Sequence, residues 1–268
     1  MAAKPGITAE RHLISTDSGG VPVATYRPAG AGPLPVLVYF PGGRFRYRFS
    51  ALYDAFCSYL AAACECVVVC ADYRLAPAAP FPAAPNDCYE ALRWVSLNAA
   101  SFGGDPRCIV VGGDSAGATL AAVVCLMAKD RGGPSIAGQI LAYPFLGGDM
   151  ETPSRLEFGN VADFINGWRA YTPRPEDASH PWATPANAPS LEDLPPALIF
   201  TGACDPLRDE GESFAAKLSA DGNGVAHFRI ANGAHGFLTS LKPEDEDIRQ
   251  AVVKLIAAEI RKRFISAP

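Results

Sequence analysis

Val110-Val111-Gly112-Gly113-Asp114-Ser115-Ala116-Gly117 places a serine between two glycines, directly after one apolar run and directly before another. The run 108–111 predicts a buried strand, and 116–129 predicts a helix. Gly113-x-Ser115-x-Gly117 between them has the form of a nucleophile elbow, a sharp strand-to-helix turn that holds a serine above a sheet. Glycines suit such a turn because neighbouring chains approach closely there and the serine backbone is strained. We therefore predict that Ser115 is a nucleophile.

The composition is that of an ordinary globular protein. The chain has 268 residues, of which 49% are hydrophobic and 19% charged, and we expect residues 1–268 to form one α/β domain. The net charge of −5 argues against nucleic acid or an anionic membrane as partner. No apolar run has the length of a membrane span, and the first residues lack the apolar core of a secretory signal. These observations predict a cytoplasmic protein.

The cysteines predict neither a disulfide framework nor a metal site. Cys64-Glu-Cys66 has the wrong spacing for a zinc knuckle, and only four histidines are present. Most of the eight cysteines stand in apolar strands or helices, so we interpret them as buried, reduced thiols. We predict no metal.

Strand and helix patterns alternate along the chain, which indicates βαβ units and a mainly parallel sheet. Residues 11–16 and 21–26 predict an opening hairpin. Further strands are expected at 36–40, 66–70, 108–111, 139–143, 197–201 and 225–230, and helices at 52–63, 86–98, 116–129, 210–219 and 246–264. We expect Asn86 or Asp87 to cap its helix.

One segment interrupts this alternation. Residues 146–195 are rich in proline, glycine, asparagine and aromatic residues, with at most one short helix expected near 161–171. Irregular insertions of this length are usually functional or disordered. We predict a small lid over the ends of the strands.

A serine nucleophile needs a base and an acid that orients the base. Asp205 directly follows the predicted strand 197–201, and His235 follows the next one, between Ala234 and Gly236. Both therefore lie at carboxyl ends of strands, where parallel sheets gather catalytic residues. The order Ser115, Asp205, His235 is that of a hydrolase triad. His12, His180 and His227 have no comparable setting.

Eight motifs occur together in one order, and together they resemble the hormone-sensitive-lipase-like family of α/β-hydrolases. They are Tyr39-Phe-Pro-Gly-Gly-Arg-Phe45, Asp72-Tyr-Arg-Leu-Ala-Pro77, Phe81-Pro-Ala-Ala84, Asp87-Cys-Tyr-Glu-Ala-Leu-Arg-Trp94, Gly113-Asp-Ser-Ala-Gly117, Tyr143-Pro144, Asp205-Pro-Leu-Arg-Asp-Glu-Gly211 and His235-Gly-Phe237. The resemblance covers about residues 11–263.

The resemblance implies the α/β-hydrolase fold and a carboxylesterase that uses no cofactor. It assigns Ser115 as nucleophile, His235 as base and Asp205 as orienting acid. It also implies an oxyanion hole formed by backbone N–H groups of Gly42, Gly43 and Ala116. The family often pairs through its last strand and helix, so a homodimer stays open.

The chain departs from the family pattern at the loop of the implied oxyanion hole. Pro41-Gly42-Gly43-Arg44 stands where His-Gly-Gly-Gly is usual, which puts catalytic efficiency in question because Pro41 has no N–H and Arg44 carries a Cβ. Because the first strand is expected to begin by about residue 11, we expect the helical segment that commonly precedes it in the family to be missing. With a lid poor in helix, this predicts an open pocket for bulky or branched substrates.

Arginines alternate beside the same loop, at 44, 46 and 48. Guanidinium groups bind carboxylate and phosphate well, so Arg44 or Arg46 is a candidate for binding an anionic or carrier-bound substrate. The alternative is a solvated basic edge paired with acids. Asp114 is a further candidate for substrate binding, although fixing loops by hydrogen bonds is the simpler role for it. Asp72 and Arg74 are expected to form a buried pair.

We conclude from the sequence that the chain hydrolyses a small-molecule carboxylic ester through an acyl-enzyme. Two alternatives remain. One is a specialised biosynthetic member, a thioesterase or a lyase or cyclase, which the altered loop favours. The other is a non-catalytic small-molecule receptor on the same fold, which the presence of all three triad candidates disfavours.

Overall fold

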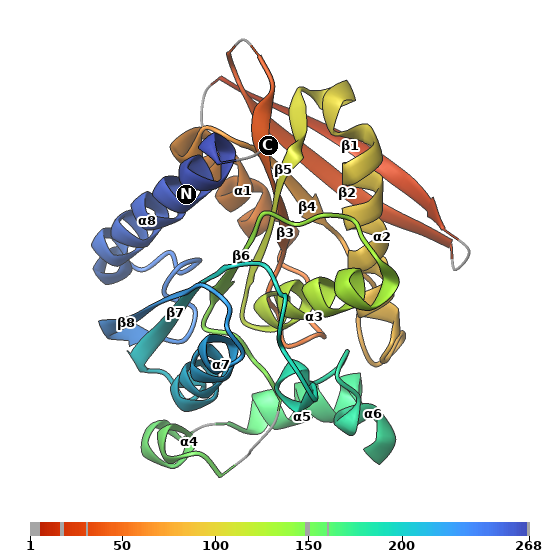
Figure 1. Cartoon of the computed structure of the whole chain (residues 1–268). Helices are drawn as coiled ribbons and strands as arrows, with labels where there is room; N and C mark the ends of the chain where they lie inside the picture. The colour runs from red at the N-terminus through yellow and green to blue at the C-terminus, as the bar shows by residue number, and fades with distance from the viewer. Residues whose placement is uncertain (1–5, 17–18, 31, 148–150, 160, 267–268) are drawn as a thin grey trace.

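The computed structural model describes residues 6–16, 19–30, 32–147, 151–159 and 161–266, and a twisted sheet runs through them (Figure 1). Eight strands of this described part follow the order β1-β2-β4-β3-β5-β6-β7-β8. Their bounds are β1 Ile7–Thr16, β2 Gly19–Pro28, β3 Leu34–Phe40, β4 Val67–Ala71, β5 Gly104–Asp114, β6 Gly138–Ala142, β7 Ala197–Cys204 and β8 Val225–Ala234. The hairpin β1–β2 and the β2–β4 pair are antiparallel, and the other neighbours pair in parallel. The predicted opening hairpin and mainly parallel sheet are confirmed.

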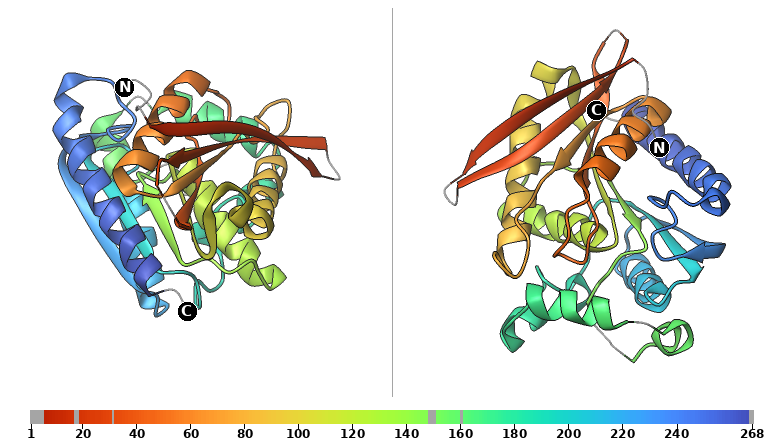
Figure 2. Two further views of the ribbon diagram at one scale, coloured as in Figure 1. Left: turned by 90° about the horizontal axis from the view of Figure 1, so that it is seen from above. Right: turned by 180° about the vertical axis from the view of Figure 1, so that it is seen from behind.

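Helices cover both faces of the sheet. Helices α1 (Ser50–Cys64) and α8 (Glu246–Ile265) lie together on one face, and α2 (Ala83–Asn98), α3 (Ala116–Arg131) and α7 (Arg208–Ala220) lie on the other (Figures 1 and 2). Short 3₁₀ turns span Ala99–Phe102 and Pro243–Asp245. Side chains alternate across each strand, so Val36, Val38 and Phe40 join the core under α2 and α3. Leu37 and Tyr39 join the core under α1 and α8.

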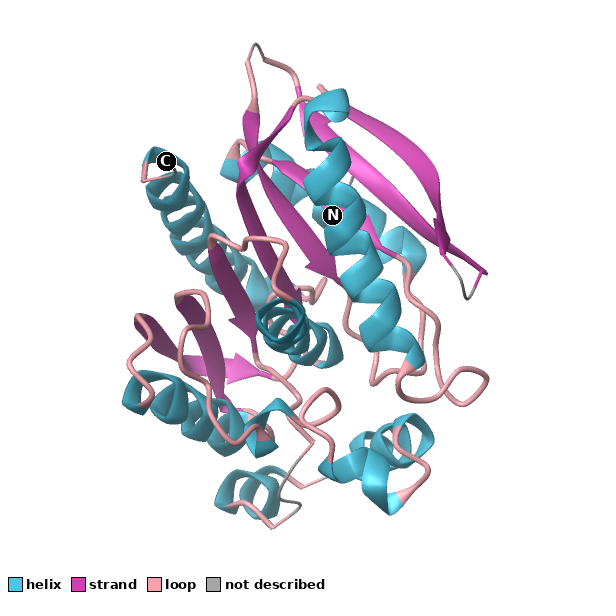
Figure 3. Ribbon diagram, turned by 45° about the vertical axis from the view of Figure 1, so that its right-hand side comes forward, coloured by secondary structure: helices cyan, strands magenta, loops and turns pink. Residues whose placement is uncertain are grey.

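The segment between β6 and β7 contains more helix than the sequence predicts. It holds α4 (Pro153–Phe158), α5 (Ala162–Tyr171), α6 (Pro175–Ser179) and a 3₁₀ turn at Pro185–Asn187. The expectation of at most one short helix is wrong. Helices of five or six residues show too little periodicity to be recognised, although prolines in the first turns of α4 and α6 favour helix initiation. Figure 3 shows these helices lying beyond the carboxyl ends of the parallel strands.

Helix α2 also differs from its prediction. It begins at Ala83 rather than near Asn86, and no side-chain hydrogen bond caps it. The Asp87 carboxylate instead accepts hydrogen bonds from the Arg74 side chain and backbone amide. No helix in the described ranges is both long and apolar enough to cross a membrane.

Candidate active site

Ser115 occupies the turn between β5 and α3 in a strained backbone conformation, with φ of 52° and ψ of −121°. Close packing explains the two glycines of the turn. A Cβ on Gly117 would lie 1.8 Å from the carbonyl oxygen of Phe40, and one on Gly113 would lie 2.4 Å from the carbonyl carbon of Gly117. The Ser115 amide donates to the Ala142 carbonyl at 2.9 Å, which ties the turn to the end of β6. The predicted strand–turn–helix context is confirmed.

The structure brings the side chains of Ser115, His235 and Asp205 together. His235 Nε2 lies 2.9 Å from Ser115 Oγ, and His235 Nδ1 lies 2.9 Å from Asp205 Oδ2. Asp205 is fully buried, and its Oδ1 also accepts a hydrogen bond from the Leu207 amide at 2.8 Å. The carboxylate therefore has a fixed orientation. With Asp205 bound to Nδ1, the ring presents Nε2 to the serine hydroxyl, as a general base requires.

Aromatic rings hold the imidazole of His235 from two sides. The ring of Tyr143 lies edge-on at 5.0 Å between centroids, and the ring of Phe164 lies edge-on at 4.9 Å. Tyr143 directly follows β6, whereas Phe164 belongs to helix α5, between β6 and β7. Helix α5 therefore forms part of the wall around the histidine and reduces its contact with water.

The loop after β3 is fixed from beneath by a buried carboxylate. Asp114 accepts hydrogen bonds from the Tyr39 hydroxyl at 2.8 Å, the Tyr53 hydroxyl at 2.9 Å and the Gly42 amide at 3.0 Å. Burial raises the pKa of the Asp114 carboxyl, and these donors act in the opposite direction. These three donors fix the position of the buried Asp114 carboxylate. Fixing the loop, the simpler alternative, describes its contacts.

These contacts also determine which of the backbone amides that the resemblance implies for the oxyanion hole are free to bind a ligand. The Gly42 amide already donates to Asp114 and to the Tyr53 hydroxyl, at 3.0 and 2.8 Å, so it has no free direction for a ligand. The amides of Gly43, Arg44 and Ala116 donate no hydrogen bond to another described residue. Arg44 adopts φ of 53°, which a side chain tolerates at a cost of about 1–2 kcal/mol.

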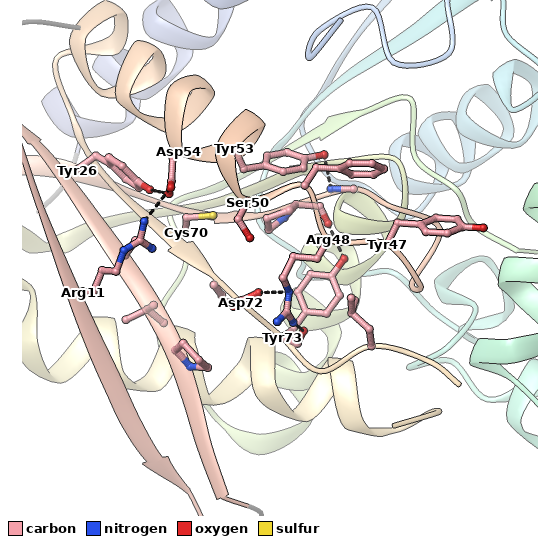
Figure 4. A pocket seen from close by; sticks show the side chains of 18 of the residues that line it. Arg11, Tyr26, Tyr47, Arg48, Ser50, Tyr53, Asp54, Cys70, Asp72 and Tyr73 are labelled. Carbon is pink, nitrogen blue, oxygen red and sulfur yellow. Dashed lines mark hydrogen bonds and ion pairs between the residues drawn. The ribbon is translucent and has the colours of Figure 1, made fainter. Parts of the chain in front are cut away.

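The outer side of this loop rests on a pocket that Figure 4 shows from close by. Pro41 and Gly42 line it together with residues of β1, β2 and α1. The Tyr73 hydroxyl donates to the Pro41 carbonyl at 2.5 Å, and Arg48 pairs with Asp72 at 2.6 Å and donates to the Tyr73 carbonyl at 3.0 Å. The bond to the Pro41 carbonyl is a second support of the loop besides Asp114.

The three alternating arginines have different environments. Arg44 lies against the lid, with its guanidinium carbon 4.9 Å from the centroid of Phe164. Arg46 stacks on the ring of its neighbour Tyr47 at 5.5 Å and lines a surface hollow. Arg48 pairs with Asp72, whose side chain is 42% exposed. The prediction of a buried pair between Asp72 and Arg74 is therefore wrong. Arg74 instead pairs with the buried Asp87 at 2.6 Å, which a helix turn brings beside it.

Several residues that shape the site were not found from the sequence. Tyr39 and Tyr53 reach Asp114 from β3 and α1, and Phe164 reaches His235 from the lid. Single tyrosines and phenylalanines in apolar segments resemble core residues, so no local signal marks them. Only the folded chain brings them to these positions.

Known proteins similar to this chain are α/β-hydrolases, and several of them are esterases. The family model described as alpha/beta hydrolase fold matches residues 37–239. Carboxylesterase NlhH of Mycobacterium tuberculosis is 37% identical over 244 residues, which cover 87% of this chain and 76% of that protein. An esterase of Pyrobaculum calidifontis superposes with a TM-score of 0.88 at 38% identity, covering 97% of this chain and 86% of the other. Gibberellin receptor GID1A of Arabidopsis thaliana is 33% identical over 224 residues, 79% of this chain and 65% of the receptor.

Proposed function

Because the chain belongs to the α/β-hydrolase family, we propose that it is a serine carboxylesterase acting through an acyl-enzyme. The observation that carries the proposal is the continuous chain of hydrogen bonds Ser115–His235–Asp205, with 2.9 Å at both junctions. The similarity to esterases over most of the chain supports the same reaction class.

In the proposed mechanism, Ser115 Oγ attacks the ester carbonyl while His235 Nε2 accepts its proton. The C–O bond of the ester then breaks, and the imidazolium returns the proton to the departing alcohol. Asp205 stabilises the imidazolium through Nδ1. In the second half, water gives its proton to His235 and attacks the acyl-enzyme, which releases the acid and restores Ser115.

We assign the oxyanion hole to the amides of Gly43, Arg44 and Ala116, in place of the predicted set of Gly42, Gly43 and Ala116. The Ala116 amide lies at the N-terminus of α3, where the helix dipole also favours negative charge. Each such donor lowers the barrier by about 3 kcal/mol. Backbone amides supply these bonds, so the proline at position 41 does not remove the proposed hole.

The remaining parts of the proposal concern organisation. We assign residues 1–268 to one domain, with 146–195 as its lid, and a carboxylic ester as its small-molecule substrate. A cytoplasmic location is supported by cysteines that are unpaired throughout the described residues.

The test is turnover of p-nitrophenyl acetate and butyrate by the unmodified protein and by Ser115→Ala. We expect the substitution to lower kcat by about 10⁴-fold or more. His235→Ala should give a loss of similar order, whereas His227→Ala serves as the matched control. His227 lies on β8, where its ring pairs with the Thr201 hydroxyl at 2.9 Å, outside the triad.

Two results contradict the proposal. Turnover that persists in Ser115→Ala excludes the serine mechanism. An unmodified, folded protein that turns over neither ester favours the non-hydrolytic alternatives, a lyase or cyclase or a ligand receptor such as the similar gibberellin receptor.

A further inference from the structure

Arg44 places a cation beside the groups that would bind the reacting ester. Its backbone lies in the loop assigned to the oxyanion hole, and helix α5 crosses over it. A Cβ on Gly167 would lie 2.6 Å from the Arg44 carbonyl oxygen. Because the helix backbone covers the start of the side chain, the rest of Arg44 extends toward Asp163 and Phe164, one turn earlier in α5.

Phe164 connects this cation to the triad. The Arg44 guanidinium carbon lies 4.9 Å from the Phe164 centroid, and the His235 ring centroid lies 4.9 Å from the same point. The guanidinium and the imidazole are therefore at most twice that distance apart. His235 Nε2 in turn lies 2.9 Å from Ser115 Oγ. The Phe164 ring is thus a wall shared by the guanidinium and by the imidazole that contacts Ser115.

The guanidinium has binding capacity left. The one ion pair that it makes with a described residue joins Nη1 to Asp163 Oδ2 at 3.8 Å, beyond hydrogen-bond distance, and Asp163 is largely exposed. Exposed ion pairs of this kind contribute little to stability. Arg44 Nε is buried and has no hydrogen-bond partner among the described residues. A buried donor without a partner is unfavourable, so a small shift of the side chain that lets this N–H reach an acceptor would be stabilising.

We propose that Arg44 selects esters that carry a carboxylate a few bonds away from the scissile carbonyl. The inference rests on the proposed esterase function and adds the substrate class to it. The carboxylate would bind the guanidinium beside Phe164, displace Asp163 and leave the carbonyl at the Gly43, Arg44 and Ala116 amides. The anionic group could stand in the acid part or in the alcohol part of the ester, and the chemistry at Arg44 is the same for both.

Matched pairs of esters show whether the carboxylate that binds Arg44 stands in the acid part or in the alcohol part of the substrate. For the acid part, mono-p-nitrophenyl esters of succinic, glutaric and adipic acid are compared with the corresponding methyl p-nitrophenyl diesters. For the alcohol part, 4-acetoxybutanoate is compared with its methyl ester. The readout is the ratio of kcat/KM for the anionic over the neutral member, which cancels any general loss of activity.

Four variants give the expected pattern. Arg44→Gln should lower the ratio about tenfold to hundredfold in one of the two series, as the loss of a charged hydrogen bond implies. Arg44→Lys should retain part of the preference. Both keep a Cβ at this strained position, so the backbone cost is unchanged. Asp163→Asn should raise the ratio by removing the competing carboxylate, and Arg169→Gln, on the exposed face of the same helix, is the matched charge control.

A binding measurement keeps the inference separate from the proposed function. In Ser115→Ala, calorimetry compares the Kd of monomethyl adipate and dimethyl adipate with and without Arg44→Gln. Tighter binding of the monoester that disappears with Arg44→Gln supports the inference even if no ester is hydrolysed. If the neutral esters are hydrolysed through Ser115 but Arg44→Gln changes neither the ratios nor the Kd values, the inference is wrong and the esterase function stands.

Discussion

Asp114→Asn tests whether one buried carboxylate holds in position the loop that we propose for the oxyanion hole. The substitution keeps the shape of the side chain and removes its charge. Three donors reach the carboxylate: the hydroxyls of Tyr39 and Tyr53 and the amide of Gly42, at 2.8, 2.9 and 3.0 Å. Hydrogen bonds to a charged group contribute about 1.5–3 kcal/mol each and neutral ones about 0.5–1.5 kcal/mol, so three donors lose about 3 kcal/mol together.

Desolvation offsets part of this loss. Burial raises the pKa of the Asp114 carboxyl, which means that the folded protein already bears a cost for the charge. We therefore expect Asp114→Asn to lower the free energy of unfolding by about 1–3 kcal/mol. Since the Gly42 amide loses its charged acceptor, the adjoining Gly43 and Arg44 amides become less well placed. We expect kcat to fall about 10- to 100-fold, less than for complete removal of an oxyanion donor, with KM little changed.

The assay combines urea unfolding with p-nitrophenyl butyrate kinetics, and Asp105→Asn is the matched control. Asp105 is also a buried aspartate of β5, paired with Arg107 at 2.8 Å, but it lies at the amino end of the strand. Its substitution should affect stability without a change in kcat. The reasoning is refuted if Asp114→Asn keeps kcat within twofold, or if Asp105→Asn lowers kcat as much.

Two further predictions concern the elbow and the lid. Gly117→Ala places a Cβ 1.8 Å from the Phe40 carbonyl oxygen and should cost at least about 3 kcal/mol in urea unfolding. Gly132, at the other end of α3, has a φ of +73° and open space around its Cα, so Gly132→Ala should lower the free energy of unfolding by only about 1 kcal/mol. Equal losses in the two variants would contradict the packing argument. Burial raises the pKa of Glu210 from 4.5 to about 7 despite its 2.8 Å contact with Arg155 of the lid. The folded state thus binds this proton more tightly than the unfolded state, so the stabilisation is complete below pH 4.5 and is lost as pH rises through about 7. Unfolding measured from pH 5 to 8 should show this decline, and Glu210→Gln, which cannot ionise, should remove it; an unchanged slope in the variant would rule out Glu210 as its source.

Local sequence patterns predicted the order of the main elements and that the side chains of Ser115, Asp205 and His235 lie together. Continuous apolar runs identify strands covered on both faces, and a serine between glycines at a strand–helix junction requires the same backbone wherever it occurs. Asp205 and His235 could be placed because each follows a strand, and the carboxyl ends of parallel strands lie at one edge of the sheet. Those inferences needed only neighbours along the chain.

Tertiary structure decided which polar groups are free and which are engaged. The resemblance assigns the Gly42 amide to the oxyanion hole, whereas β5 and α1 bring Asp114 and the Tyr53 hydroxyl within hydrogen-bond distance of that amide. Arg74 pairs with Asp87 rather than Asp72 because α2 begins early enough to turn that carboxylate toward it. The short lid helices, and Phe164 against His235, depend on packing against the rest of the fold rather than on local propensity. Which groups form hydrogen bonds and ion pairs with one another depends on their distance in the folded protein, and the spacing of residues along the chain does not determine that distance.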